Sequence, residues 1–167
     1  PYQHLFHAND TRPNILFSER NDSLILEKGY YELSRKILIP KNKTVVFKAG
    51  VELDLVNTAS IISESVVYFN GTESEPIKFF SSDSSSNGFT VLQAQSRSIV
   101  KYTTFSGLNT LDFWGWTLSG AVNFYESNVD FTNCTFEKNL CEDALNMGRY
   151  HLNVSSCNFS TIYADAS

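Results

Sequence analysis

Three residues in the second half of the chain, Glu126, Asp143 and Arg149, have the chemical types of an acid–base site. Glu126 and Arg149 are separated by one period of an internal repeat, so their side chains are expected to stack as an ion pair. Glycoside hydrolysis needs two carboxyl groups roughly 5–9.5 Å apart. Glu126 with Glu142 or Asp143 is the candidate pair, although two adjacent acids in a turn are more often solvated than catalytic.

A second group of residues has the chemistry of ligand binding. Both tryptophans, Trp114 and Trp116, fall in residues 106–120, SGLNTLDFWGWTLSG, together with Asp112, and Tyr125 follows shortly after. Indole rings suit the faces of sugars, and such a loop can offer them as a binding platform. The alternative, which is the more common one, is that the loop folds back and packs against the body of the protein.

The composition excludes several other classes of function. The chain has 167 residues, of which 42% are hydrophobic and 14% aromatic, enough for a folded core. Thirteen Lys and Arg against eighteen Asp and Glu give a net charge of -5, which argues against nucleic-acid binding. No apolar run approaches the ~18 residues of a membrane span. The three cysteines and three histidines fit no metal-binding spacing, so no cofactor and no metal site are predicted.

The candidate residues lie within an internal repeat. The phrase NVDFTNCTF at 128–136 returns as HLNVSSCNF at 151–159, which places Phe136 over Phe159. The same offset places Ala121 over Ala144. A looser copy, SIVKYTTF at 98–105, precedes its counterpart at 129–136 by a longer interval. The additional eight residues correspond to the insertion that carries the tryptophans.

Within each copy the apolar residues alternate, as in Val129-x-Phe131, which predicts short strands rather than helices. Short strands at this period bury a common side only if the chain coils and stacks equivalent residues about 4.8 Å apart. The pattern therefore predicts a parallel β-helix. Further short strands are expected at 24–26, 37–39, 44–47, 51–55, 59–62, 66–69, 77–80 and 89–92.

These phrases also support a family resemblance. The stretches GTESEPIKFFSS from Gly71 and SIVKYTTFSG from Ser98, with the paired NCTF and SCNF, resemble the right-handed parallel β-helix repeat proteins of the pectate-lyase-like superfamily. The resemblance implies an all-β, right-handed, single-stranded solenoid in a secreted or cell-surface protein. The superfamily includes lyases, hydrolases and epimerases that act on polysaccharides, as well as modules without known chemistry. Lyases of this kind hold Ca²⁺ with outward-facing carboxylates, which makes Ca²⁺ the one cofactor that the resemblance suggests.

The two ends of the chain are expected to differ. Residues 1–45 are more polar and irregular, and we interpret them as an N-terminal cap and extended segment before a β-helix at 46–167. After residue 160 a further rung begins and then stops, so an uncapped C-terminal rung is expected. The β-helix is therefore predicted to continue beyond residue 167, or to meet the remainder of a larger chain or a neighbouring subunit at this edge.

Cysteines occupy equivalent positions in the two clearest copies of the repeat. Cys134 and Cys157 both follow the strand pattern directly, so they are expected to lie in neighbouring rungs. A spacing of about 4.8 Å lies within the Cα range of disulfides, ~4.4–6.8 Å. Buried thiols in neighbouring rungs are nevertheless usually small apolar fillers, and that is the role predicted for both.

Three functional hypotheses follow from the sequence. The leading one is a structural or carbohydrate-binding module, with the ligand at the Trp114/Trp116 loop. The alternative is a polysaccharide-acting enzyme, a lyase, epimerase or hydrolase, that uses the outward-facing acids and Arg149. The third is a scaffold that self-associates through its last rung.

Overall fold

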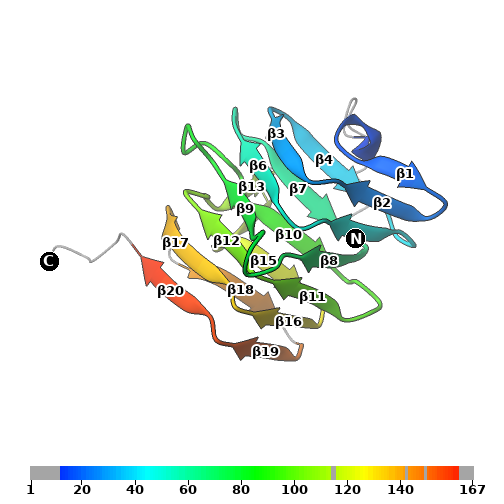
Figure 1. Cartoon of the computed structure of the whole chain (residues 1–167). Helices are drawn as coiled ribbons and strands as arrows, with labels where there is room; N and C mark the ends of the chain where they lie inside the picture. The colour runs from blue at the N-terminus through cyan, green and yellow to red at the C-terminus, as the bar shows by residue number, and fades with distance from the viewer. Residues whose placement is uncertain (1–11, 114–115, 142, 149, 162–167) are drawn as a thin grey trace, which may run out of the picture.

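The computed structural model describes residues 12–113, 116–141, 143–148 and 150–161. Three sheets lie around a common axis, and the chain contributes one strand to each sheet in every coil (Figure 1). Their strands pair in parallel, except that the edge strand at Ser18–Arg20 pairs antiparallel with Ser23–Leu26. The described residues form five complete coils and two strands of a sixth. Their helical content is limited to one 3₁₀ turn, η2 (Pro13–Ile15). The predicted all-β parallel solenoid is therefore confirmed.

We name the sheets in the order in which the chain visits them. Sheet A contains β1 (Ser18–Arg20), β2 (Ser23–Leu26), β5 (Thr44–Phe47), β8 (Val66–Asn70), β11 (Ser98–Lys101), β16 (Val129–Thr132) and β19 (Leu152–Ser155). Sheet B contains β3 (Gly29–Leu33), β6 (Val51–Leu55), β9 (Ile77–Phe80), β12 (Thr103–Ser106), β17 (Thr135–Asn139) and β20 (Asn158–Thr161). Sheet C contains β4 (Lys36–Ile39), β7 (Ser60–Ser63), β10 (Phe89–Leu92), β15 (Gly120–Tyr125) and β18 (Asp143–Gly148). A separate antiparallel hairpin is formed by β13 (Leu111–Phe113) and β14 (Trp116–Leu118).

The register of the sheets reproduces the repeat seen in the sequence. Val129 pairs with Leu152 on β16 and β19, one repeat period apart, and Phe136 pairs with Phe159 on β17 and β20. Val100 pairs with Phe131, so the looser copy is also in its expected register. Equivalent residues of successive copies thus lie directly above one another.

Stacked aromatic rings fill the interior. On sheet B the ring of Phe105 lies between those of Phe79, at 5.7 Å, and Phe136, at 5.1 Å, and Phe159 continues the stack at 4.8 Å. Phe79, Phe105 and Phe136 are fully buried. Because parallel pairing repeats the same inward position in each coil, one alternating pattern in the sequence builds a continuous dry core.

The first coil is formed by strands within residues 23–39. Strands β2, β3 and β4 pair in parallel with β5, β6 and β7, so the first coil starts at Ser23. Leu24 and Leu26 are buried because the next coil supplies the matching Val45 and Phe47. Two apolar side chains are sufficient for a strand here, because the neighbouring coil covers them.

Several corners between sheets contain a residue in the left-handed conformation. Tyr102, Asn133 and Ser156 have φ of 46°, 53° and 53° at successive turns from sheet A to sheet B. Gln93 and Glu126 have φ of 50° and 48° at the turns from sheet C to sheet A. A single such residue changes the direction of the strand sharply, which lets short strands close a coil.

None of the described residues forms a helix that is long and apolar enough to cross a membrane.

Candidate functional site: a polar groove at one corner of the solenoid

The turns from sheet C to sheet A line up along one corner of the solenoid, and they form a pocket there. Its volume is about 350 Å³. It is lined by Gln93, Ala94, Gln95, Glu126, Asn128 and Tyr150. These residues come from three successive turns, so the pocket exists only because the coils stack in register.

Glu126 is the charged residue in the lining of this pocket. Its backbone follows β15, and its N–H donates to the carbonyl of Gly148 in the next coil at 3.0 Å. Gln93 occupies the same place one coil earlier, where its N–H donates to the carbonyl of Tyr125 at 2.9 Å. The side chains then meet, since Gln93 Nε2 donates to Glu126 Oε2 at 2.6 Å. The pocket therefore presents a fixed carboxylate and a fixed amide side by side.

Asn128 and Tyr150 also line the pocket. Oδ1 of Asn128 accepts the backbone N–H of His151 at 3.0 Å, which orients the Asn128 amide. Tyr150 is 54% exposed and adds an aromatic ring to the lining. A carboxylate, amides and one exposed ring form the kind of lining that binds a ligand with both hydroxyl groups and apolar faces.

A second pocket continues along the same corner toward the N-terminal end. Its volume is about 250 Å³, and Gln95 belongs to both pockets. Lys41 and Glu64 contribute charges to its lining. Burial raises the pKa of the Glu64 carboxyl, and the positive charge of Lys41 opposes that shift. We call the two pockets together the corner groove; its full lining adds Asn42, Lys43, Thr44, Ser65, Val66 and Ser96.

The structure does not bring the predicted acid pair together. Asp143 pairs with Gly120 at the start of β15, whereas Glu126 follows the end of the same strand. Six residues at ~3.3 Å each separate the two places by roughly 20 Å. The Asp143 carboxylate instead accepts the hydroxyl of Ser119 at 2.9 Å. A paired-carboxylate site of Glu126 and Asp143 is thus incompatible with the strand register.

Other predicted positions fall partly outside the described residues. The predicted site residues outside the described part are Trp114, Glu142 and Arg149. The expected ion pair of Arg149 with Glu126 falls outside it as well. For Trp116 the structure describes the backbone, as the first residue of β14.

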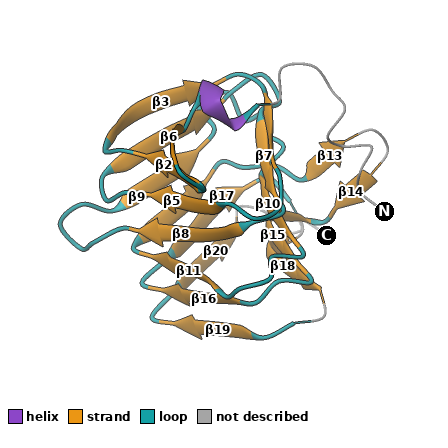
Figure 2. Ribbon diagram, turned by 90° about the vertical axis from the view of Figure 1, so that its right-hand side faces the viewer, coloured by secondary structure: helices purple, strands orange, loops and turns teal. Residues whose placement is uncertain are grey.

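The insertion folds back onto the outer face of sheet C. Figure 2 shows β13 and β14 outside the layer formed by β7, β10, β15 and β18. Leu111 is fully buried there, in a second apolar cluster that also contains Leu38, Ile62 and Leu92, with Leu118 and Tyr125 packed against it. The two leucines of the hairpin and Tyr125 therefore pack against the body of the protein, as expected if the insertion folds back.

Backbone contacts hold the hairpin at this position. The carbonyl of Asp112 accepts hydrogen bonds from Lys36 Nζ at 3.3 Å and from Asn87 Nδ2 at 3.2 Å, while Asp112 as a residue is exposed. Partial burial lowers the pKa of Lys36, and the negative charge of Asp112 opposes the shift. The hairpin is thus attached by both apolar and polar contacts.

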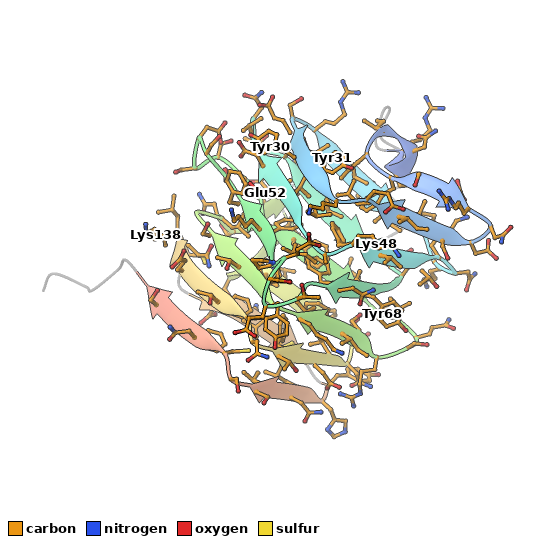
Figure 3. The ribbon with its side chains drawn as sticks, viewed as in Figure 1. Tyr30, Tyr31, Lys48, Glu52, Tyr68 and Lys138 are labelled. Atoms are coloured by element: carbon orange, nitrogen blue, oxygen red, sulfur yellow. The ribbon has the colours of Figure 1, made fainter. Side chains whose placement is uncertain are left out.

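A second polar surface, on the outer face of sheet B, is mainly paired within itself. Tyr30 and Glu52 lie on neighbouring strands, as Figure 3 shows, and are in register. Lys78 Nζ lies 3.3 Å from Oε1 of Glu52, and the Tyr30 hydroxyl donates to Asp54 Oδ2 at 3.2 Å. This face is a ladder of mutually satisfied groups, typical of an exposed sheet.

Sequence reasoning missed Gln93, Gln95, Asn128 and Tyr150. Gln93 precedes Glu126 by more than the regular repeat period, because the hairpin insertion separates their coils. A signal for these residues is present in the sequence, because polar residues directly follow most of the sheet C strands. It can be used only after each strand has been assigned to its coil.

Comparisons with family models, with curated proteins and with solved structures find no match to this chain. Among the described residues, no three His, Cys, Asp or Glu side chains come together in a way that could hold a metal ion.

Proposed function

We propose that this chain is a carbohydrate-binding module of a secreted or cell-surface protein, and that a saccharide binds in the corner groove. The observation that supports this most is that two polar pockets lie along the same corner and share Gln95 in their linings. Together they draw on five successive turns between sheets C and A, so the groove runs along the solenoid axis.

The shape of the groove suits an extended chain of sugars. Successive coils repeat at about 4.8 Å, which is close to the length of one sugar residue in an extended polysaccharide. Each turn adds side chains that donate or accept hydrogen bonds, as sugar hydroxyls require. Tyr150 supplies a ring for the apolar face of one sugar.

The corner groove and the tryptophan hairpin are alternative places for this ligand. Asp112, Trp114 and Trp116 remain the candidates of the hairpin, whereas Tyr125, on β15, packs against the apolar cluster beneath it. The two places are separable, because a groove ligand depends on Tyr150 and Glu126, whereas a hairpin ligand depends on the indole rings.

The binding experiment uses the full chain on an array of plant, bacterial and animal glycans, followed by calorimetric titration with the best oligosaccharide. Tyr150→Ala is expected to weaken binding about 5- to 30-fold, since a stacked ring and its buried contacts contribute roughly 1–2 kcal/mol. Tyr30→Ala is the matched control, because Tyr30 is also exposed, at 60%, but lies on sheet B. Loss of binding in Trp114→Ala or Trp116→Ala with Tyr150→Ala unaffected would move the site to the hairpin.

A polysaccharide-acting enzyme is the second candidate, because Glu126 lies inside the groove and could act on a bound saccharide. The same oligosaccharides, incubated with the protein and analysed by mass spectrometry, distinguish the two functions. Cleavage or epimerisation that Glu126→Gln abolishes would establish the enzyme, whereas unchanged oligosaccharides with measurable binding support the module.

A further inference from the structure

Two cysteines lie directly above one another where the solenoid turns from sheet A to sheet B. Cys134 follows Asn133, and Cys157 follows Ser156, both in the left-handed conformation with φ of 53°. The strands before and after them keep the register of the repeat: β16 pairs with β19 throughout, and β17 pairs with β20 in register up to Glu137. Because the strands before and after the cysteines are in register, the two cysteines lie one above the other in adjacent coils.

The sulfur of the outer cysteine contacts the inner one. The backbone N–H of Cys134 lies 3.4 Å from Cys157 Sγ and donates to it, and the N–H of Asn158 donates to the Cys134 carbonyl at 2.9 Å. Burial raises the pKa of the Cys134 thiol to about 12, and the neighbouring Cys157 contributes to this shift. Cys134 is 1% exposed, whereas Cys157 is only half-buried and can be reached from solvent.

We infer that Cys134 and Cys157 form a disulfide that fastens the sixth coil to the fifth when the protein meets an oxidised low-molecular-weight thiol, for example oxidised glutathione. The accessible Cys157 thiolate attacks the glutathione disulfide, forms a mixed disulfide and releases one glutathione. Cys134 then attacks Cys157 Sγ as a thiolate, the sulfur–sulfur bond to glutathione breaks, and the departing glutathione thiolate takes up the proton that Cys134 has lost. Two protein thiols and one oxidised glutathione thus give one protein disulfide and two reduced glutathiones.

The sixth coil is the part of the described chain that such a bond would restrain most. Its strands β19 and β20 pair on one side only, at the end of the stack (Figure 1). The inward-facing positions of this coil are occupied by apolar residues that no further described coil covers. These are Leu152, Val154 and Phe159, which are 38%, 42% and 46% exposed. The bond would close a loop that includes Tyr150, and it forms whether or not the groove binds a saccharide.

Peptide mapping tests the inference in a Cys141→Ser background, where only the two stacked thiols remain. Cys141 Sγ–H donates to the Asp143 carbonyl at 2.9 Å, and serine can make the same bond. After incubation with oxidised glutathione and digestion without reductant, a cross-linked peptide pair containing positions 134 and 157 is expected within one chain. Hydrogen exchange in residues 152–161 is expected to slow at least about tenfold on oxidation.

The control is Cys157→Ser in the same background, in which exchange in 152–161 should not respond to the oxidant. A mixed disulfide that persists on Cys157, or a bond between two chains through Cys157, would overturn the inference. If Cys141→Ser does not fold, mapping of the unaltered chain decides the question, and a bond from Cys141 to either of the other two cysteines counts against it.

Discussion

Gln93 Nε2 donates a hydrogen bond to Glu126 Oε2 at 2.6 Å, although the two residues lie 33 positions apart in the sequence. Both residues are in the left-handed conformation, which is uncommon for side chains other than Gly, Asn and Asp. The turn directs both side chains out of the corner, and the stacking of coils brings them together. Their contact is therefore a property of the solenoid and defines one wall of the corner groove.

Replacing Glu126 with asparagine should separate binding from folding. Asparagine tolerates the left-handed conformation better than glutamate, so the free energy of unfolding is expected to stay within about 1 kcal/mol of the unaltered protein. The carboxylate is lost, and saccharide affinity should fall at least about tenfold. Chemical denaturation and calorimetric titration measure the two effects, with Glu137→Gln on sheet B as the control. Unchanged affinity in Glu126→Asn would remove Glu126 from the site.

Truncating one ring of the central stack should destabilise the whole solenoid. Phe105→Ala removes a fully buried ring between Phe79 and Phe136, and the expected loss of unfolding free energy is about 3–5 kcal/mol. Denaturant unfolding followed by circular dichroism measures it. Phe80→Ala, on the outer face of the same sheet, should cost clearly less. Equal losses in the two variants would contradict the position of the core.

Truncating a leucine of the hairpin should loosen the hairpin more than the solenoid. Leu111→Ala removes a buried side chain from the cluster with Leu38, Ile62 and Leu92, which is expected to cost about 2–3 kcal/mol locally. Hydrogen exchange of the amides in β13 and β14 should speed up, while exchange in β6 and β9 stays nearly unchanged. Asp112→Ala is the control, because the backbone carbonyl that accepts Lys36 and Asn87 is kept. Faster exchange throughout the solenoid would show that the hairpin is an integral part of it.

The turn between sheets B and C should make stability sensitive to acid. The backbone N–H of Asn57, then the hydroxyl and N–H of Ser85, lower the pKa of the Asp83 carboxyl to about 2. Because the folded-state pKa lies below the unfolded value, the stabilisation is present above about pH 4 and is lost as pH falls toward 2. Asp83→Asn should therefore be less stable than the unaltered protein at pH 6. The difference should disappear near pH 2, and thermal melts across this range measure it; a constant difference would exclude the carboxylate as its cause.

The short-range alternation of apolar residues was sufficient to predict the main strands. The alternation in Val129-x-Phe131 and its return in Leu152-x-Val154 reflect a physical requirement that recurs in every coil, because each inward position contacts its own equivalent in the next coil. The same requirement acts on the first coil, where Leu24 and Leu26 pair with Val45 and Phe47 of the next coil.

The candidate site was predicted only in part. Glu126 lies in the groove, but Asp143 is at the opposite end of the neighbouring strand, since a shared repeat period says nothing about which end of a strand a residue occupies. The insertion was recognised, yet its docking on sheet C depends on outward-facing Leu38, Ile62 and Leu92. Those three positions come from three different coils and have no common spacing.

Periodicity along the chain determined that this protein coils, which residues form its dry interior and which positions repeat, because neighbouring coils impose the same local pattern again and again. Only the tertiary structure decided which turns meet at a corner, how Gln93 reaches Glu126 and where the hairpin docks. Turns and insertions differ in length from coil to coil, so their meeting points are set by the stacked sheets and not by any interval that can be counted in the sequence.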